Sequence, residues 1–134
     1  MTRSPSHGAS GKRVLVVDDA SLARLYYREV LEAAGFVVDE EMNGIEALEK
    51  LLLGDVDLLV VDVNMPQMDG MTFLRALRRQ ALPLAATPAL VASTEAGAQD
   101  AAAATEAGAN AYLVKPLSAD RLTLYALAMT GSGA

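Results

Sequence analysis

The chain has no cysteine and a single histidine, and both facts limit the disulfides and catalytic groups that it can form. Without cysteine it forms no disulfide, and cysteine usage gives no indication of a redox compartment. The one histidine, His7, lies among the first eleven residues, which are polar and rich in Ser and Gly. We expect residues 1–11 to form a mobile tail that lacks the apolar segment of a secretory signal and takes no part in catalysis.

Positive charge and long apolar runs are also scarce. The 134 residues include 11 Lys and Arg against 17 Asp and Glu, which gives a net charge of −6 and a pI of about 4.6. The arginines Arg75, Arg78 and Arg79 are expected on one exposed helix face and form no basic patch for nucleic acid or an anionic membrane. No apolar run approaches the ~20 residues of a membrane helix. These features predict a cytoplasmic protein that binds neither nucleic acid nor membrane.

The body of the chain alternates short apolar runs with longer segments of helical period, which is typical of repeated βα units. Strands are expected at residues 13–17, 36–39, 58–61, 89–92 and 111–114. Helices are expected from about residue 22 until Gly35, at 44–53 with Asn43 as cap, at 71–80, through the alanine-rich stretch to 107, and at 119–129. The pattern predicts one doubly wound α/β domain over residues 12–129 with a short tail, 130–134. No Gly-x-Gly-x-x-Gly or Gly-Lys-Ser/Thr motif indicates a nucleotide site.

Apolar residues recur at helical spacing in the first two expected helices. The two stripes consist of Leu22, Leu25, Tyr26, Val30 and Leu31, and of Ile45, Leu48 and Leu52. Such stripes are expected to face the sheet.

Charged side chains stand where three of the expected strands end. Asp18 and Asp19 follow the first strand, Asp62 follows the third, and Lys115 follows the fifth, directly before Pro116. In an open parallel sheet the carboxyl ends of the strands converge on one edge, where ligands bind at the switch of strand order. Three acids in one cleft repel one another unless a hard divalent cation and an ammonium lie among them. The pattern predicts a Mg²⁺ site beside a nucleophilic carboxylate.

These residues belong to four segments that resemble the receiver domain of bacterial two-component response regulators, most of all the stand-alone chemotaxis type. The segments are VLVVDDA with Asp18 and Asp19, VVDVNMPQMDG with Asp62, ALVASTEA with Ser93, and AGANAYLVKP with Tyr112 and Lys115. Their order and spacing make the resemblance specific. It implies a flavodoxin-like fold of five parallel strands in the order 2-1-3-4-5 with five helices. It also implies a cis peptide bond between Lys115 and Pro116.

Roles in the site follow partly from position and partly from the resemblance. Asp62, at the tip of a buried central strand, is predicted to attack phosphorus and form an acyl phosphate. Lys115 is predicted to neutralise the phosphoryl oxygens as a point charge. Asp19 is expected to bind Mg²⁺ directly and Asp18 partly through water, with Asp62 also a ligand. The resemblance adds the backbone carbonyl of Asn64.

The resemblance also implies a switch built from a hydroxyl and an aromatic ring. Alternation along the strand turns only one of Ser93 and Thr94 toward the pocket, and the family's hydroxyl-x-Glu-Ala pattern selects Ser93. Thr94, with Asn64 and Glu95, is expected to control access to the pocket and the lifetime of the phosphorylated state. Tyr112 matches the family's aromatic switch, and a half-buried strand tyrosine explains it equally well.

The fourth and fifth expected helices indicate what kind of partner the chain binds and on which surface. Where the chemotaxis type carries lysines, this chain has Gly97 and Ala98, so a strongly acidic partner peptide finds little to pair with. In the last helix a stripe of Leu122, Ala126 and Met129 is expected against the sheet, yet the rest of the helix is also apolar. We therefore expect a covered face on the fourth helix, fifth strand and fifth helix that includes Tyr112, Leu124, Tyr125 and Ala128. The cover is a downstream protein or a second copy of the chain; scattered apolar residues on an alanine-rich protein are the alternative.

The predicted function is a single-domain response regulator that takes a phosphoryl group from a sensor histidine kinase or a histidine phosphotransfer protein. It is a switch that catalyses its own phosphorylation and slow hydrolysis. Its outputs include the flagellar motor switch, a phosphate sink or a phosphorelay, and the sequence does not decide among them. The alternative class is an aspartyl-phosphate phosphohydrolase of the haloacid dehalogenase type, which expects Asp-x-Asp at the first strand, where Asp18 and Asp19 are adjacent. A pseudo-receiver is disfavoured by the complete set of acids and lysine.

Overall fold

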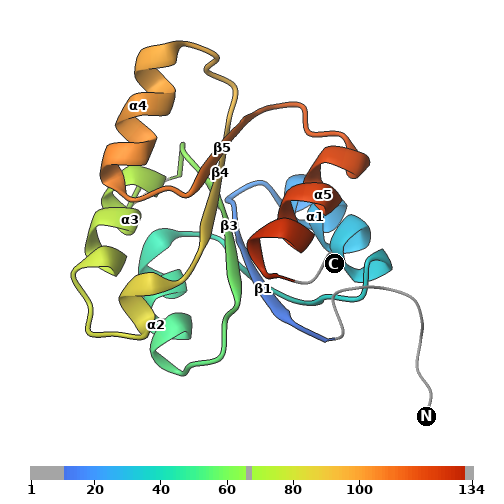
Figure 1. Cartoon of the computed structure of the whole chain (residues 1–134), viewed down its shortest axis with the longest axis horizontal. Helices are drawn as coiled ribbons and strands as arrows, with labels where there is room; N and C mark the ends of the chain where they lie inside the picture. The colour runs from blue at the N-terminus through green and yellow to red at the C-terminus, as the bar shows by residue number, and fades with distance from the viewer. Residues whose placement is uncertain (1–10, 66–67, 132–134) are drawn as a thin grey trace.

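A computed structural model describes residues 11–65 and 68–131, and its strands form one parallel sheet (Figure 1). The strand order is β2-β1-β3-β4-β5. The strands are β1 Arg13–Val17, β2 Val37–Glu41, β3 Leu58–Asp62, β4 Ala89–Ser93 and β5 Ala111–Val114. Order and direction confirm the predicted doubly wound, flavodoxin-like fold, and the strand ends differ from the expected ones by two residues at most.

Helices cover both faces of the sheet, with α1 and α5 on one side and α2, α3 and α4 on the other (Figure 1). Their bounds are α1 Ser21–Ala33, α2 Gly44–Leu52, α3 Gly70–Arg78, α4 Ala98–Ala107 and α5 Ala119–Met129. A short 3₁₀ helix, Leu84–Ala86, lies in the proline-containing connection before β4. Asn43 caps α2 as expected, because its side chain accepts a hydrogen bond from the N–H of Glu46 at 2.9 Å.

Side chains that alternate along the central strands supply two separate cores. On β1, Val14 and Val16 pack toward α1 and α5, while Leu15 and Val17 pack toward α2, α3 and α4. All residues of β3 are buried, which explains why this strand is apolar throughout. The sheet therefore holds the carboxyl ends of β1 and β3 between two packed layers.

The predicted apolar stripes of α1 and α2 are partly wrong. In α1 the buried residues are Tyr27 and Leu31, and in α2 they include Ala47 and Leu51. Several stripe residues are exposed instead: Leu22, Leu25, Tyr26, Ile45 and Leu52. Both helices carry more apolar residues than one buried face needs. The spacing of apolar residues therefore predicted a stripe that is rotated about the helix axis from the face that is buried. In α2 the small residue Ala47 is fully buried in the core on this side of the sheet.

The ends of the described chain are tied to the domain. The N–H of Gly11 donates to the carbonyl oxygen of Gly35 at 3.0 Å, and the Lys12 ammonium donates to the carbonyl oxygen of Thr130 at 2.7 Å. Most of the expected N-terminal tail, with His7, lies outside the described residues, as do residues 132–134. Within the described ranges, no helix has both the length and the apolar character that crossing a bilayer requires.

Arg78 was expected on an exposed helix face, and this expectation is wrong. Its guanidinium donates at 2.7–3.1 Å to the carbonyl oxygens of Gly108, Ala85 and Thr87 and to the side-chain oxygen of Asn110. Burial lowers the pKa of Arg78. Gly108 has a φ of +120°, and a Cβ there would lie 2.7 Å from Arg78 Cγ. One side chain thus joins the end of α3 to the turn before β5 and to the connection before β4.

We predict that Arg78→Met lowers the free energy of unfolding by about 2 to 4 kcal/mol, because several carbonyl oxygens lose their donor. Arg79→Met, which removes the same charge from the neighbouring exposed position, should change it by less than about 0.5 kcal/mol. Urea unfolding followed by circular dichroism measures both values. Equal shifts for the two variants would show that the Arg78 hydrogen bonds contribute nothing to stability.

Candidate functional site

Three carboxylates meet at the carboxyl edge of the sheet. Asp62 is the last residue of β3, and Asp18 and Asp19 follow the neighbouring strand β1. One oxygen from each carboxylate lies within 4.8 Å of the other two. Asp18 and Asp62 are 1% and 8% exposed, whereas Asp19 is open to solvent. The structure therefore brings together the three acids that the sequence placed at strand ends.

The Lys115 ammonium reaches the same cluster from the end of β5. It lies 2.9 Å from Asp62 Oδ1, to which it donates a hydrogen bond, and 3.5 Å from Asp18 Oδ2. The backbone N–H of Lys115 donates to the carbonyl oxygen of Ser93 at 2.7 Å, so the ends of β4 and β5 are tied together. The peptide bond between Lys115 and Pro116 is cis, as expected.

Burial and charge act against each other in this cluster. Burial raises the pKa of Asp62, and the charges of Asp18 and Asp19 raise it further, against the hydrogen bond and charge of Lys115. Burial lowers the pKa of Lys115, but the hydrogen bond to Asp62 and the charges of Tyr27, Asp18 and Asp62 outweigh it and leave this pKa raised. A single ammonium opposite three carboxylates leaves negative charge uncompensated.

The oxygens of Asp18 show how a cation would fit. Oδ1 accepts a hydrogen bond from the N–H of Ala20 at 2.9 Å. Among the described residues, Oδ2 is the buried side-chain atom that has no hydrogen-bond partner. A buried carboxylate oxygen without a donor, beside two further carboxylates, is a ligand set that suits a hard divalent ion such as Mg²⁺.

Ser93 and Tyr112 are linked through the backbone of Glu95. Ser93 is 1% exposed, and its Oγ accepts a hydrogen bond from the N–H of Glu95 at 3.0 Å. The hydroxyl of Tyr112 donates to the carbonyl oxygen of Glu95 at 2.6 Å. Thr94 is exposed and lines an apolar groove of about 650 Å³ together with Lys115. Asn64 is also exposed, in the loop after β3.

The expected partner face needs one correction. Leu124 is 65% exposed, but it lines a groove of about 740 Å³ between α1 and α5 rather than the side of α5 that borders β5. Successive helix residues are turned by about 100°, so Leu124 and Tyr125 point in different directions. Tyr125 packs partly against the core with the Arg121 guanidinium 5.7 Å from its ring centroid, and Ala128 is exposed.

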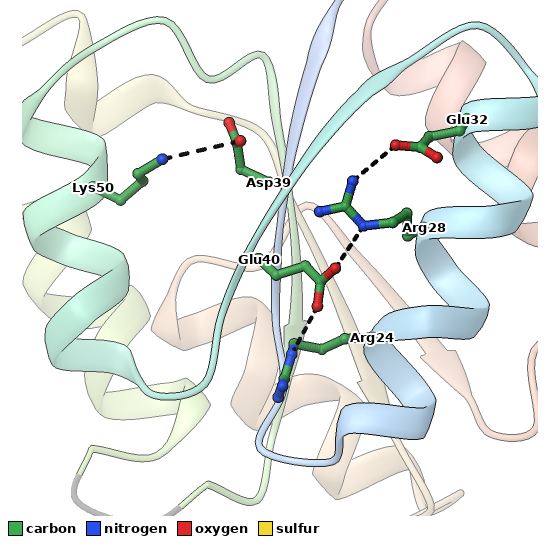
Figure 2. Close-up of polar contacts among 6 residues, drawn as sticks. All are labelled: Arg24, Arg28, Glu32, Asp39, Glu40 and Lys50. Carbon is green, nitrogen blue, oxygen red and sulfur yellow. Dashed lines mark hydrogen bonds and ion pairs between the residues drawn. The ribbon is translucent and has the colours of Figure 1, made fainter.

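Sequence reasoning missed two residues beside the cluster. Tyr27 is buried on α1, and burial raises its pKa to about 12 while the charge of Lys115 acts in the opposite direction. Arg24, also on α1, donates to the backbone carbonyl of Asp18 at 2.6 Å. It also donates to Glu40 Oε1 at 2.9 Å (Figure 2). No motif indicates either residue, since both contacts depend on how α1 packs against the sheet.

Residues 14–126 match the family model of the response regulator receiver domain. The chain is 37% identical over 112 residues to the chemotaxis protein CheY of Bacillus subtilis, which covers 82% of this chain and 90% of that protein. It is 41% identical over 106 residues to a protein-glutamate methylesterase/protein-glutamine glutaminase of Archaeoglobus fulgidus, covering 78% of this chain and 30% of that protein. The structure of the chemotaxis response regulator CheY4 of Vibrio cholerae superimposes with a TM-score of 0.83 and 33% identity, covering 89% and 98% of the two chains.

Asp62→Asn is expected to stabilise the metal-free protein near neutral pH. Because the pKa of Asp62 is raised in the folded chain, its contribution to stability is full below the ordinary aspartate pKa of about 3.9. This contribution is lost as the pH rises through the raised value. Asparagine does not titrate, so the variant should melt a few degrees above the parent at about pH 7, with the gap closing toward about pH 3.5. Thermal unfolding in EDTA measures the gap, and one that widens toward acid pH would contradict the assigned shift.

Proposed function

The chain belongs to the response regulator receiver domain family, and on that premise we propose that it is a phosphoacceptor switch in which Asp62 receives a phosphoryl group. The observation that carries the proposal is the Lys115 ammonium 2.9 Å from Asp62 Oδ1, inside a cluster of three carboxylates. The donor is a phosphohistidine on a sensor histidine kinase or a histidine phosphotransfer protein. The protein works in the cytoplasm and is a switch rather than a metabolic enzyme.

The transfer is an exchange of one bond for another at phosphorus. The Lys115 hydrogen bond engages Asp62 Oδ1, which leaves Oδ2 as the attacking atom. As the bond from Oδ2 to phosphorus forms, the bond from phosphorus to the donor's imidazole nitrogen breaks, and its electron pair leaves with the imidazole. Lys115 then balances charge on the phosphoryl oxygens. Asp18, Asp19 and Asp62 would hold Mg²⁺ together with the backbone carbonyl of Asn64, and the bound ion would supply further neutralisation of that charge.

Phosphorylation is read out through Ser93 and Tyr112. The Ser93 oxygen accepts a hydrogen bond from Glu95, so its own proton is available for a phosphoryl oxygen. Movement of Ser93 toward that oxygen pulls on the segment whose Glu95 carbonyl holds the Tyr112 hydroxyl. The ring of Tyr112 thereby reports the state of the pocket to the surface formed by α4, β5 and α5.

The output is protein contact on this surface, at Tyr112, Tyr125 and Ala128. Helix α4 has no lysine, so a downstream protein or a second copy of the chain binds there mainly by apolar contact. The similarity to chemotaxis proteins favours a chemotaxis target such as the flagellar motor switch. A phosphate sink and a phosphorelay intermediate are the alternatives, and they differ in where the phosphoryl group goes next.

Incubation with acetyl phosphate and Mg²⁺ should attach one acid-labile phosphoryl group per chain, and EDTA should prevent it. Asp62→Asn should remain unlabelled, while Asp57→Asn, directly before β3 at the opposite edge of the sheet, should label like the parent. Intact-mass spectrometry followed by peptide mapping gives both stoichiometry and position. Labelling of Asp62→Asn would place the nucleophile elsewhere, and sustained multiple turnover of the donor would favour the phosphohydrolase class.

Thr94→Ala should accelerate autophosphorylation by acetyl phosphate several-fold. Thr94 lines the same groove as Lys115, and we expect its branched side chain to hinder both a small donor and attacking water. Thr105→Ala, on the exposed side of α4, serves as the matched control. Stopped-flow or mass-resolved time courses give the rates. Identical rates for Thr94→Ala and the control would show that Thr94 does not limit access.

A further inference from the structure

Arg24 connects the acidic cluster to strand β2. From α1, its guanidinium donates through Nη1 to the backbone carbonyl of Asp18 at 2.6 Å. Through Nε it donates to Glu40 Oε1 at 2.9 Å (Figure 2). Its side chain is 16% exposed, which makes it the least exposed cation of the ion pairs on this part of β2. The two contacts lie on different elements, so Arg24 holds the loop after β1 against the neighbouring strand.

The carbonyl that Arg24 binds belongs to the peptide unit joining Asp18 to Asp19. Because a peptide unit is planar, fixing its oxygen fixes the direction in which both flanking residues leave it. Asp18 is further held by its own N–H, which donates to Glu41 O at 3.1 Å, and by the Ala20 N–H on Oδ1 at 2.9 Å. These contacts leave Asp18 Oδ2 as the oxygen that faces the cluster.

Glu40 holds Arg24 in place and is itself held from its other side. Its Oε2 accepts a hydrogen bond from Arg28 Nε at 2.6 Å, and Arg28 Nη1 donates to Glu32 Oε2 at 2.8 Å (Figure 2). The hydrogen bond from Arg28 lowers the pKa of Glu40, so this carboxylate stays ionised at neutral pH. Both oxygens of Glu40 are therefore engaged by guanidinium groups, and the two arginine charges are balanced by Glu40 and Glu32.

We propose that Arg24, anchored by Glu40, is a positioning residue for Mg²⁺ binding by Asp18 and Asp19. It sets the plane of the peptide between the two acids, and Glu40 cancels a positive charge that would otherwise repel the ion. The role rests on the proposed function, because it concerns the same metal site. Groups that orient the ligands of a metal in this way typically change its affinity by about 10- to 100-fold.

A second ion pair on β2 offers a matched comparison. Asp39, next to Glu40, points to the other side of the strand, where the Lys50 ammonium on α2 lies 4.0 Å away (Figure 2). Both partners are about one third exposed, and the pair contacts neither Asp18 nor Asp19. Removing Lys50 takes away one positive charge from a helix that borders β2, as removing Arg24 does, without releasing the Asp18 carbonyl.

The affinity of the unphosphorylated chain for Mg²⁺, measured by isothermal titration calorimetry, tests the proposal. The direction in which a substitution changes this affinity separates the two explanations. Loss of a nearby positive charge alone would tighten Mg²⁺ binding, whereas loss of a positioning group weakens it. We expect Arg24→Gln to raise the dissociation constant about tenfold. Arg24→Lys should raise it as well, because one ammonium cannot hold two acceptors in the guanidinium geometry. Lys50→Gln should leave it within about twofold of the parent.

Circular dichroism in EDTA establishes whether each variant is folded. If Arg24→Gln is unfolded, the Mg²⁺ affinity of Arg24→Lys is the measurement that tests the proposal. Unchanged or tighter Mg²⁺ binding in the folded Arg24 variant, or an equal loss in Lys50→Gln, overturns the positioning role. A parent chain that binds no Mg²⁺ overturns the metal site of the proposed function along with it. A parent that binds Mg²⁺ and is phosphorylated on Asp62, beside an Arg24 variant with full affinity, overturns the positioning role alone.

Discussion

Repulsion among three carboxylates at one sheet edge is the constraint that shapes this domain. Asp18, Asp19 and Asp62 are gathered there because their strands are adjacent and parallel. Lys115 compensates only part of their charge, and burial makes the remainder harder to tolerate. The excess negative charge would favour binding of a cation, and the hydrogen bonds from Lys115 to Asp62 and from the N–H of Ala20 to Asp18 hold two of the acids in place.

The parts of this site that could be predicted from the sequence are those fixed by the chain's local pattern. An apolar run that ends in an acid places that acid at the tip of a strand, and parallel strands bring their tips together, which located Asp18, Asp19, Asp62 and Lys115. The doubly wound α/β class followed from the same pattern, and the strand order 2-1-3-4-5 followed from the family resemblance. The roles of these residues rest on the proposed chemistry and on the family resemblance.

The remaining features depend on how helices are rotated and where long side chains reach. The exposed positions of Leu22 and Ile45 and the placement of Leu124 beside α1 follow from helix rotation, which an excess of apolar residues conceals. Arg24 and Arg78 look like surface arginines in the sequence because each binds backbone carbonyls, of Asp18 for Arg24 and of Thr87 and Gly108 for Arg78. Every residue has a backbone carbonyl, whatever its side chain. A hydrogen bond from an arginine to a carbonyl therefore cannot be recognised in the sequence as a pair of opposite charges.

The sheet separates two hydrophobic cores, one on each of its faces. Alternation assigns Asp62 to the side of α1 and α5 and Ser93 to the side of α2, α3 and α4, so the chemical edge belongs to both compartments. The side chains of the two cores pack against different helices. Substitutions around α4 therefore change packing in a different core from that of α1, whose Arg24 contacts the loop that carries Asp18.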